Sequence, residues 1–69
     1  MGRYADLVKS YLKEQKPALL QELKAAGELE RFCFQREAAA TKQRIQLEES
    51  AGLEEWEADE IARADLLDF

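Results

Sequence analysis

The side chains that could carry out nucleophilic catalysis are few, and none of them has a base available. The 69-residue chain contains a single cysteine, Cys33, and no histidine. A cysteine–histidine or serine–histidine pair therefore cannot form around Cys33, Ser10 or Ser50. No glycine-rich sequence of the kind that binds phosphates is present either. We expect no enzymatic activity and no cofactor, and we interpret Cys33, which lies between two phenylalanines, as a small core residue.

Four carboxylates in the C-terminal part of the chain have a spacing that could bind a divalent cation. Glu54, Glu57 and Glu60 follow one another at intervals of three residues, and Asp59 lies among them. Residues three apart lie on one face of a helix, where their oxygens could ligate Mg²⁺ or Ca²⁺. A ferritin-like di-iron site would need a Glu-x-x-His pair, which a chain without histidine lacks. A solvated acidic face is the more common role of such a pattern, so no metal is predicted.

Positive and negative charges are divided between the two parts of the chain. Residues 1–44 hold nine of the ten Lys and Arg against six acids, a net charge of +3, whereas residues 45–69 hold nine acids and only Arg63, a net charge of −8. The simplest interpretation is that the two parts complement each other, within one chain or between two. Basic side chains on a helix can also neutralise phosphates, so a nucleic-acid interface is an alternative. Its contacts would be Lys9, Lys13, Lys16, Lys24, Arg36, Lys42 and Arg44.

Large apolar side chains are numerous for so short a chain. We expect Leu7, Leu23 and Phe32 to belong to the core. Tryptophan and tyrosine are enriched at interface hot spots, and Trp56 and the C-terminal residues lie in the acidic segment, where a contact with another chain is favoured. The predicted partner-binding residues are Tyr11, Trp56, Ile61, Leu66, Leu67 and Phe69.

The first part of the chain has the apolar spacing of two consecutive helices. Tyr4, Val8 and Leu12 recur every four residues, and Leu7 and Tyr11 lie beside them, which predicts a helix over residues 3–15. Proline ends one helix and suits the first turn of the next, so Pro17 predicts a second helix over residues 17–26. Gly27 can take the left-handed conformation that closes this helix.

Residues 28–49 contain no helix breaker and predict the longest helix. One apolar stripe consists of Leu29, Phe32, Cys33, Arg36, Ala40, Gln43 and Leu47, and a second of Phe34, Ala38, Thr41 and Ile45. Arg36 and Gln43 would be costly in a dry core, so the middle of this helix should be wet or paired with acids of a partner. The three alanines at 38–40 would allow another helix to approach closely.

A break at residues 50–52 separates the long helix from a predicted helix over residues 53–67. Ser50 or Gly52 is expected to cap this last helix, and glutamates in its first turn suit the positive end of the helix dipole. Its predicted apolar stripe consists of Leu53, Trp56, Glu60, Ile61, Ala64 and Leu67.

Two blocks of the chain share a spacing of aromatic, basic and apolar residues with a known family. The first block is Tyr11-Leu12-Lys13-Glu14, Lys16-Pro17, Leu19, Leu23, Gly27 and Leu29, and the second is Ala58-Asp59-Glu60-Ile61 with Ala64-Asp65-Leu66-Leu67. They resemble the small helical proteins of the TnpV type, which are encoded in transposons and related mobile elements. The segment between the blocks is shorter here than in that family. The resemblance implies a helical accessory protein from a mobile element or phage.

The sequence therefore predicts an all-α fold, a small bundle of three to four helices with one long central helix, in a single domain spanning residues 1–69. So short a chain buries little apolar surface, and one cysteine excludes an intramolecular disulfide, so we expect dimerisation to complete the core. No apolar run approaches the roughly 20 residues of a membrane span, and the N-terminal residues lack a signal peptide's apolar core. No membrane contact and a cytoplasmic location are expected.

The function class that remains is a non-enzymatic interaction or structural protein. We expect it to associate with itself, and another protein is a further partner to consider. Two alternatives stay open. One is a small DNA-binding accessory protein that uses the basic face of residues 9–44, and the other is an inhibitor whose acidic helix imitates nucleic-acid charge.

Overall fold

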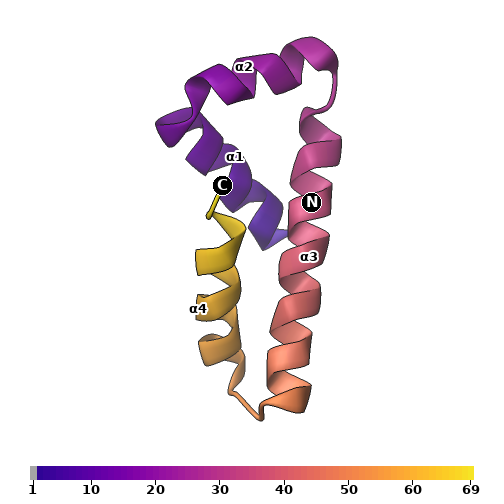
Figure 1. Ribbon diagram of the computed structural model, residues 1–69, viewed down its shortest axis with the longest axis vertical. Coiled ribbons are helices and arrows are strands. Elements are labelled where there is room, and N and C mark those ends of the chain that lie inside the picture. Colours follow the sequence, from indigo (N-terminus) through magenta and orange to yellow (C-terminus); the bar gives the residue numbers. More distant parts are fainter. Residues whose placement is uncertain (1) are drawn as a thin grey trace.

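The computed structural model describes residues 2–69 and contains four α-helices and no strand over that range (Figure 1). The helices are α1 (Arg3–Gln15), α2 (Pro17–Ala26), α3 (Leu29–Ser50) and α4 (Glu55–Leu66). The prediction of an all-α fold with one long central helix is confirmed. The bounds of α1 and α2 coincide with those predicted, α3 is displaced by one residue at each end, and α4 begins two residues later than expected.

Pro17 and Gly27 define the two ends of α2. Pro17 occupies the first turn of α2, where its missing N–H is not needed, and the N–H of Lys16 closes the last turn of α1. Gly27 has a φ of +70°, which allows the N–H of Glu28 to donate to the carbonyl of Leu23 at 2.9 Å. These short connections make the chain change direction sharply on both sides of α2.

The turn between α3 and α4 uses a different cap from the one predicted. Gly52 has a φ of +68° and lets the chain reverse after α3. Glu54 is the N-cap of α4, and its backbone N–H donates to Glu57 at 3.2 Å while its side chain accepts from the backbone of Glu57. The expected cap at Ser50 or Gly52 is therefore wrong. The reciprocal pair of glutamates satisfies two free N–H groups and places negative charge at the positive helix end.

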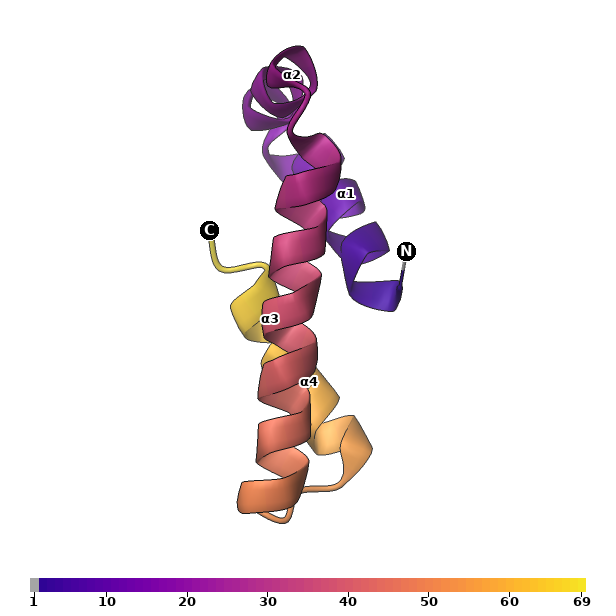
Figure 2. The same ribbon diagram turned by 90° about the vertical axis from the view of Figure 1, so that its right-hand side faces the viewer.

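Helix α3 runs along most of the molecule and carries the other helices on its surface (Figures 1 and 2). Helices α1 and α4 both pack against α3. Helix α2 connects α1 to α3 and lies across one end of the molecule. The structure measures 41 × 19 × 17 Å, so it is an elongated and thin body. A body of this shape leaves much of each helix in contact with solvent.

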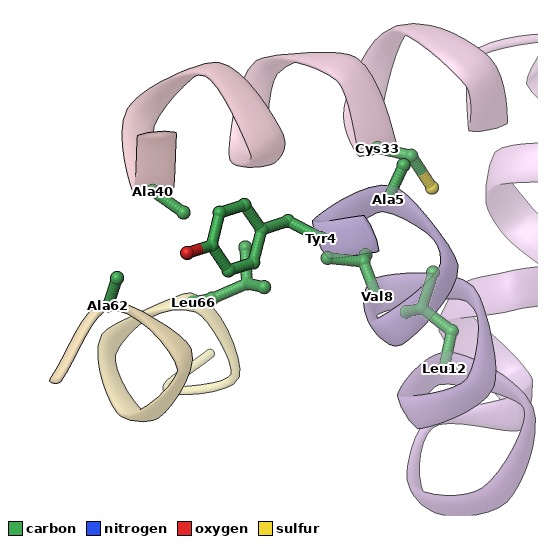
Figure 3. Close-up of a cluster of buried hydrophobic side chains, with 8 residues drawn as sticks. All are labelled: Tyr4, Ala5, Val8, Leu12, Cys33, Ala40, Ala62 and Leu66. Carbon is green, nitrogen blue, oxygen red and sulfur yellow. The ribbon is translucent and has the colours of Figure 1, made fainter. Parts of the chain in front are cut away.

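The core lies where α1, α3 and α4 meet. Tyr4, Val8 and Leu12 form the buried stripe of α1, as their spacing predicts. The Tyr4 ring lies between α3 and α4, close to Ala40 and Leu66 (Figure 3). Helix α2 has no fully buried residue and adds only partly buried leucines, one of which is Leu23. The predicted core residues Leu7, Leu23 and Phe32 all pack against this cluster.

Helices α3 and α4 pack through small side chains. Ala58 and Ala62 are fully buried and Ala40 nearly so. The predicted apolar stripe of α4 is therefore wrong, because two of its members, Trp56 and Ile61, point into solvent. Alanine lets two helix backbones approach closely and loses no side-chain entropy on burial. A contact made through Trp56 would hold the helices apart and leave Tyr4 without its neighbours.

Candidate functional site

A buried tyrosine connects α1 to α4. The hydroxyl of Tyr4 donates to Oδ1 of Asp59 at 2.5 Å, while the ring of Tyr4 is only 2% exposed. Oδ2 of Asp59 forms an ion pair with Nε of Arg63, one turn later, at 2.8 Å, and Nη2 of Arg3 lies 3.6 Å from Oδ1. Tyr4 and Asp59 are 55 residues apart, so no local pattern in the sequence could indicate this pair.

The hydrogen bond changes the pKa of both partners. Burial raises the pKa of Tyr4 above its ordinary value of 10.0, and the bond to Asp59 adds to that effect. The same bond, helped by the charges of Arg63 and Arg3, lowers the pKa of Asp59 below 3.8. A neutral phenol and a charged carboxylate therefore face each other at neutral pH. Because both groups are occupied with each other, the junction is suited to holding helices together rather than to acid–base catalysis.

Arg44 of α3 lies beside this junction. Its Nη1 donates to Glu48, one turn along α3, at 2.8 Å, and its side chain is only 19% exposed. Its Nε is buried, and no residue of the described range 2–69 accepts a hydrogen bond from it. The positive charge of Arg44 also contributes to lowering the pKa of Asp59. Arg44 therefore points toward the helix junction and away from the surface where a phosphate could reach it.

Glu37 of α3 caps the first turn of α1. Its Oε1 accepts from the backbone N–H of Gly2 at 3.2 Å, and its Oε2 accepts from the N–H of Ala5 at 2.7 Å. The N-cap residue of α1 is Gly2, which has no side chain to perform this role. The carboxylate of Glu37 thus satisfies two N–H groups that α1 leaves free, and its charge suits the positive end of the helix.

Arg36, the neighbour of Glu37 in α3, caps the C-terminal end of α4. Its Nε and Nη2 donate to the carbonyl of Leu66 at 3.0 and 2.8 Å. Its guanidinium also lies over the ring of Phe69, 4.2 Å from the ring centre. A positive charge is favourable at a helix C-terminus, where carbonyl groups are unpaired. Glu37 and Arg36 are consecutive residues of α3. Glu37 therefore caps the N-terminus of α1, and Arg36 caps the C-terminus of α4.

Arg36 and Gln43, the two polar residues in the first stripe of α3, are bonded within the chain. Gln43 donates to Oδ2 of Asp65 in α4, and Arg36 binds the end of the same helix. The expectation that this stretch is paired with acids of a partner is therefore corrected: the partner groups belong to α4 of the same chain. One feature of the sequence indicated this contact: Arg36, a charged residue, lies within an apolar stripe. A charged group that is buried needs hydrogen-bond acceptors around it.

Replacing Glu37 with glutamine is expected to lower the free energy of unfolding by about 1–2 kcal/mol. Glutamine has one acceptor oxygen, and its NH₂ group would face an N–H donor of α1. Urea denaturation followed by circular dichroism measures the effect. Glu22→Gln is the matched control, since Glu22 is exposed on α2 and makes no ion pair among residues 2–69. Equal losses in the two variants would contradict the capping role of Glu37.

An open depression of about 320 Å³ lies beside the Arg36 cap. Its lining includes Phe32, Arg36, Ala40, Gln43, Asp65 and Leu66. The guanidinium of Arg36 and the amide of Gln43 are already bonded to α4. A small molecule entering the depression would therefore find few free polar groups to fix its orientation.

The structure separates the six predicted partner-binding residues into two groups. Leu66 is buried in the core of its own chain, and Phe69 packs edge-to-face on Tyr11 and Phe32, with ring centres 5.3 and 5.4 Å apart. Leu67 is partly buried against the same core. The C-terminal residues therefore contact other helices of their own chain, and their contact with a second chain stays a prediction. These residues follow α4 back onto α1 and α3, where Arg36 holds them.

The second group consists of side chains that remain at the surface. Trp56 is 68% exposed and Ile61 is 42% exposed, both on α4. Sequence reasoning did not select two further residues of this kind, Phe34 and Ile45 of α3, which are 68% and 42% exposed. The signal for them was present, because the second stripe of the long helix contains both. Their exposure shows that α3 packs on its neighbours with the first stripe and leaves the second toward solvent.

The seven basic residues considered for nucleic-acid contacts do not form one free surface. Lys9 pairs with Glu30 at 3.1 Å, and Arg36 and Arg44 are bound within the helix junctions. The exposed side chains that remain lie on three different helices or in the turn between two of them. They are Lys13, Lys16, Lys24 and Lys42.

Over residues 2–69, no helix is both long and apolar enough to cross a membrane. In the same part of the chain, no group of three His, Cys, Asp or Glu side chains is placed to hold a metal ion. Cys33 is buried as a free thiol, and burial raises its pKa. No protein-family model matches this chain, and no curated protein and no solved structure matches it either.

Proposed function

We propose that this chain is a non-enzymatic helical interaction protein that associates with itself as a dimer. The observation that carries the proposal is the exposure of large apolar side chains on two helices. Phe34 on α3 and Trp56 on α4 are each 68% exposed, and Ile45 and Ile61 are each 42% exposed. Exposed aromatic side chains of this kind are enriched at surfaces that bind another protein.

The small size of the core supports the proposal. The largest fully buried side chains are Tyr4, Leu12, Val8 and Cys33, in a body only 19 × 17 Å in cross-section. A chain of this size buries a smaller fraction of its surface on folding than a larger domain does. Contact with a second chain would bury further apolar surface, and each Å² buried stabilises the folded state by roughly 25 cal/mol. The resemblance to proteins of the TnpV type supports a role as an accessory protein of a transposon or phage.

The dimer is tested by sedimentation equilibrium of the purified chain over a wide range of concentrations. We expect a mass near twice 7.9 kDa at micromolar concentration, with dissociation and a fall in helicity on dilution. The two changes should coincide, since each chain gains stability from its partner by mass action. A mass of 7.9 kDa at every concentration, with a thermal transition that does not change on dilution, would show that the proposal is wrong.

The nucleic-acid alternative has less support, since three of its seven basic residues are held within the chain. Titration with duplex and single-stranded DNA at two salt concentrations decides it. Binding that weakens steeply as salt rises would favour the alternative, because released counterions drive such binding. No retention of DNA at low salt removes it.

A further inference from the structure

The outward face of α3 carries a narrow stripe of apolar side chains. Phe34, Ala38, Thr41 and Ile45 follow one another at intervals of four, three and four residues. This is the spacing of a helix face that packs lengthwise against another helix. Phe34 and Ile45, the large residues at its two ends, are 68% and 42% exposed. None of the neighbouring helices covers them, so the stripe is an unpartnered edge of the molecule, which we call the α3 seam.

The order of residues along the α3 seam is self-complementary. If a second α3 lies antiparallel, with its centre between residues 39 and 40, Phe34 comes opposite Ile45 of the second copy. In the same arrangement Ala38 comes opposite Thr41 of the second copy. The two small residues thus meet in the middle, where the backbones must approach closely, and each large residue meets a large one toward the ends. A twofold axis requires this symmetry, because every contact occurs twice.

Along one edge of the α3 seam, two exposed charges agree with the antiparallel arrangement. Arg31 and Glu49 are both exposed, and neither takes part in an ion pair among residues 2–69. They are 18 residues apart, which is five full turns, so they lie along the same edge of the helix at a separation of about 27 Å. In the antiparallel arrangement each Arg31 comes within one residue of the level of Glu49 of the second copy, about 1.5 Å along the helix axis. A parallel twofold arrangement would place the two copies of this edge on opposite sides of the interface, so that neither Arg31 would meet a Glu49.

We infer that the partner of the α3 seam is a second copy of this chain, bound antiparallel through Phe34, Ala38, Thr41 and Ile45 and flanked by two Arg31–Glu49 ion pairs. This inference rests on the proposed self-association and specifies its surface. The exposed residues of α4, Trp56 and Ile61, lie outside the interface. The four-residue seam buries the largest exposed side chains of α3 without disturbing the contacts that hold α1 and α4 in place.

The charged pair is tested by reversing each charge and then mixing the variants. Arg31→Glu and Glu49→Arg each bring like charges together twice, and each is expected to weaken dimerisation roughly tenfold at low salt. Mixing the two variants in equal amounts restores opposite charges at both positions, so a heterodimer with wild-type affinity is expected. Lys24→Glu, an equal charge change on α2, is the control and leaves the dissociation constant unchanged. Sedimentation equilibrium supplies each constant.

The apolar part is tested by a matched pair of substitutions. Ile45→Asp on the seam and Ile61→Asp on α4 change residues of equal exposure, 42%, so both variants are expected to stay folded by circular dichroism. Only Ile45→Asp is expected to weaken the dimer, by tenfold or more.

Four results would overturn the inference. A wild-type dimer that is unaffected by Arg31→Glu, Glu49→Arg and Ile45→Asp would use another surface, and the proposed self-association would stand. Loss of the dimer in Ile61→Asp but not in Ile45→Asp would assign the interface to α4. Charge variants that do not recover affinity on mixing would exclude the antiparallel arrangement. A wild-type chain that is monomeric at every concentration would overturn the proposed function as well.

Discussion

Replacing Tyr4 with alanine is expected to unfold most of the chain under conditions in which the wild type is folded. The Tyr4 ring is buried between α3 and α4, where Ala40, Ala62 and Leu66 lie around it (Figure 3). Removing a buried aromatic ring costs about 3–5 kcal/mol. A domain of this size has a total stability of the same order, roughly 5 kcal/mol. Circular dichroism and urea denaturation should show a large loss of helix in the Tyr4→Ala variant.

The Tyr4→Phe variant separates the hydrogen bond from the packing of the ring. It keeps the ring and removes the hydroxyl, so it is expected to stay folded and to lose about 1–2 kcal/mol. If it were as unstable as Tyr4→Ala, the bond to Asp59 rather than the ring would dominate the junction. If Tyr4→Ala melted like the wild type, the three-helix core described above would be wrong.

The same variant should change how stability depends on pH. Asp59 has a lower pKa in the folded chain than in the unfolded chain, so its ionised form stabilises the fold above about pH 3.8 and this contribution is lost as the pH falls through the lowered pKa. Tyr4 has a raised pKa, so its protonated form stabilises the fold below pH 10.0 and that contribution is lost as the pH rises through the raised pKa. The Tyr4→Phe variant has no phenol to ionise, so it should not lose this stability at high pH. It should also lose less stability than the wild type as the pH falls, because Asp59 no longer accepts the hydrogen bond.

Urea denaturation of the wild type and Tyr4→Phe at acidic, neutral and alkaline pH measures these differences. The two stability curves should lie furthest apart at neutral pH and approach each other toward both extremes. Parallel curves over the whole range would show that the Tyr4–Asp59 bond makes no contribution to the pH dependence.

The second large effect is expected at Arg36. Replacing it with methionine keeps a long apolar stem but removes both hydrogen bonds to the carbonyl of Leu66 and the contact with the face of Phe69. Hydrogen bonds from a charged donor and a cation–π contact together contribute about 2–4 kcal/mol, and the unpaired carbonyl at the end of α4 adds to the loss. Arg36→Met should therefore destabilise the chain by that amount in urea denaturation.

Arg36→Lys distinguishes the shape of the guanidinium from its charge. Lysine keeps the positive charge near the helix C-terminus but cannot place two parallel donors on one carbonyl. An intermediate stability is expected, and hydrogen exchange should show faster opening of residues 63–69 than of α1. Wild-type stability in both variants would mean that the C-terminal residues are held by Phe69 packing and not by Arg36.

The limits of each helix were predictable because the signals for them are local. Pro17 cannot continue a helix, Gly27 can take a positive φ, and the apolar residues of α1 repeat at the helical period. These effects act between residues a few positions apart, so the order of amino acids is sufficient to reveal them. The start of α4 was less accurate, since Glu54 and several nearby residues are all able to cap a helix.

The face that α4 buries was not predictable in the same way. Hydrophobicity favours a stripe that contains Trp56 and Ile61, yet the buried residues are Ala58, Ala62 and Leu66. The choice depends on how closely α3 can approach, and Ala40 of α3 permits a close approach only to small side chains. That information lies in the match between two surfaces and not in either helix alone.

The sequence by itself determined that this protein is a series of four helices with too few large apolar residues for a thick core. Only the tertiary structure decided how the ends of those helices are completed. Glu37 and Arg36 are adjacent in the chain but cap helices that lie before and after them, because α3 passes between the start of α1 and the end of α4. Unpaired N–H and carbonyl groups need partners wherever these can be found, and a partner 30 residues away becomes near only when the chain has folded.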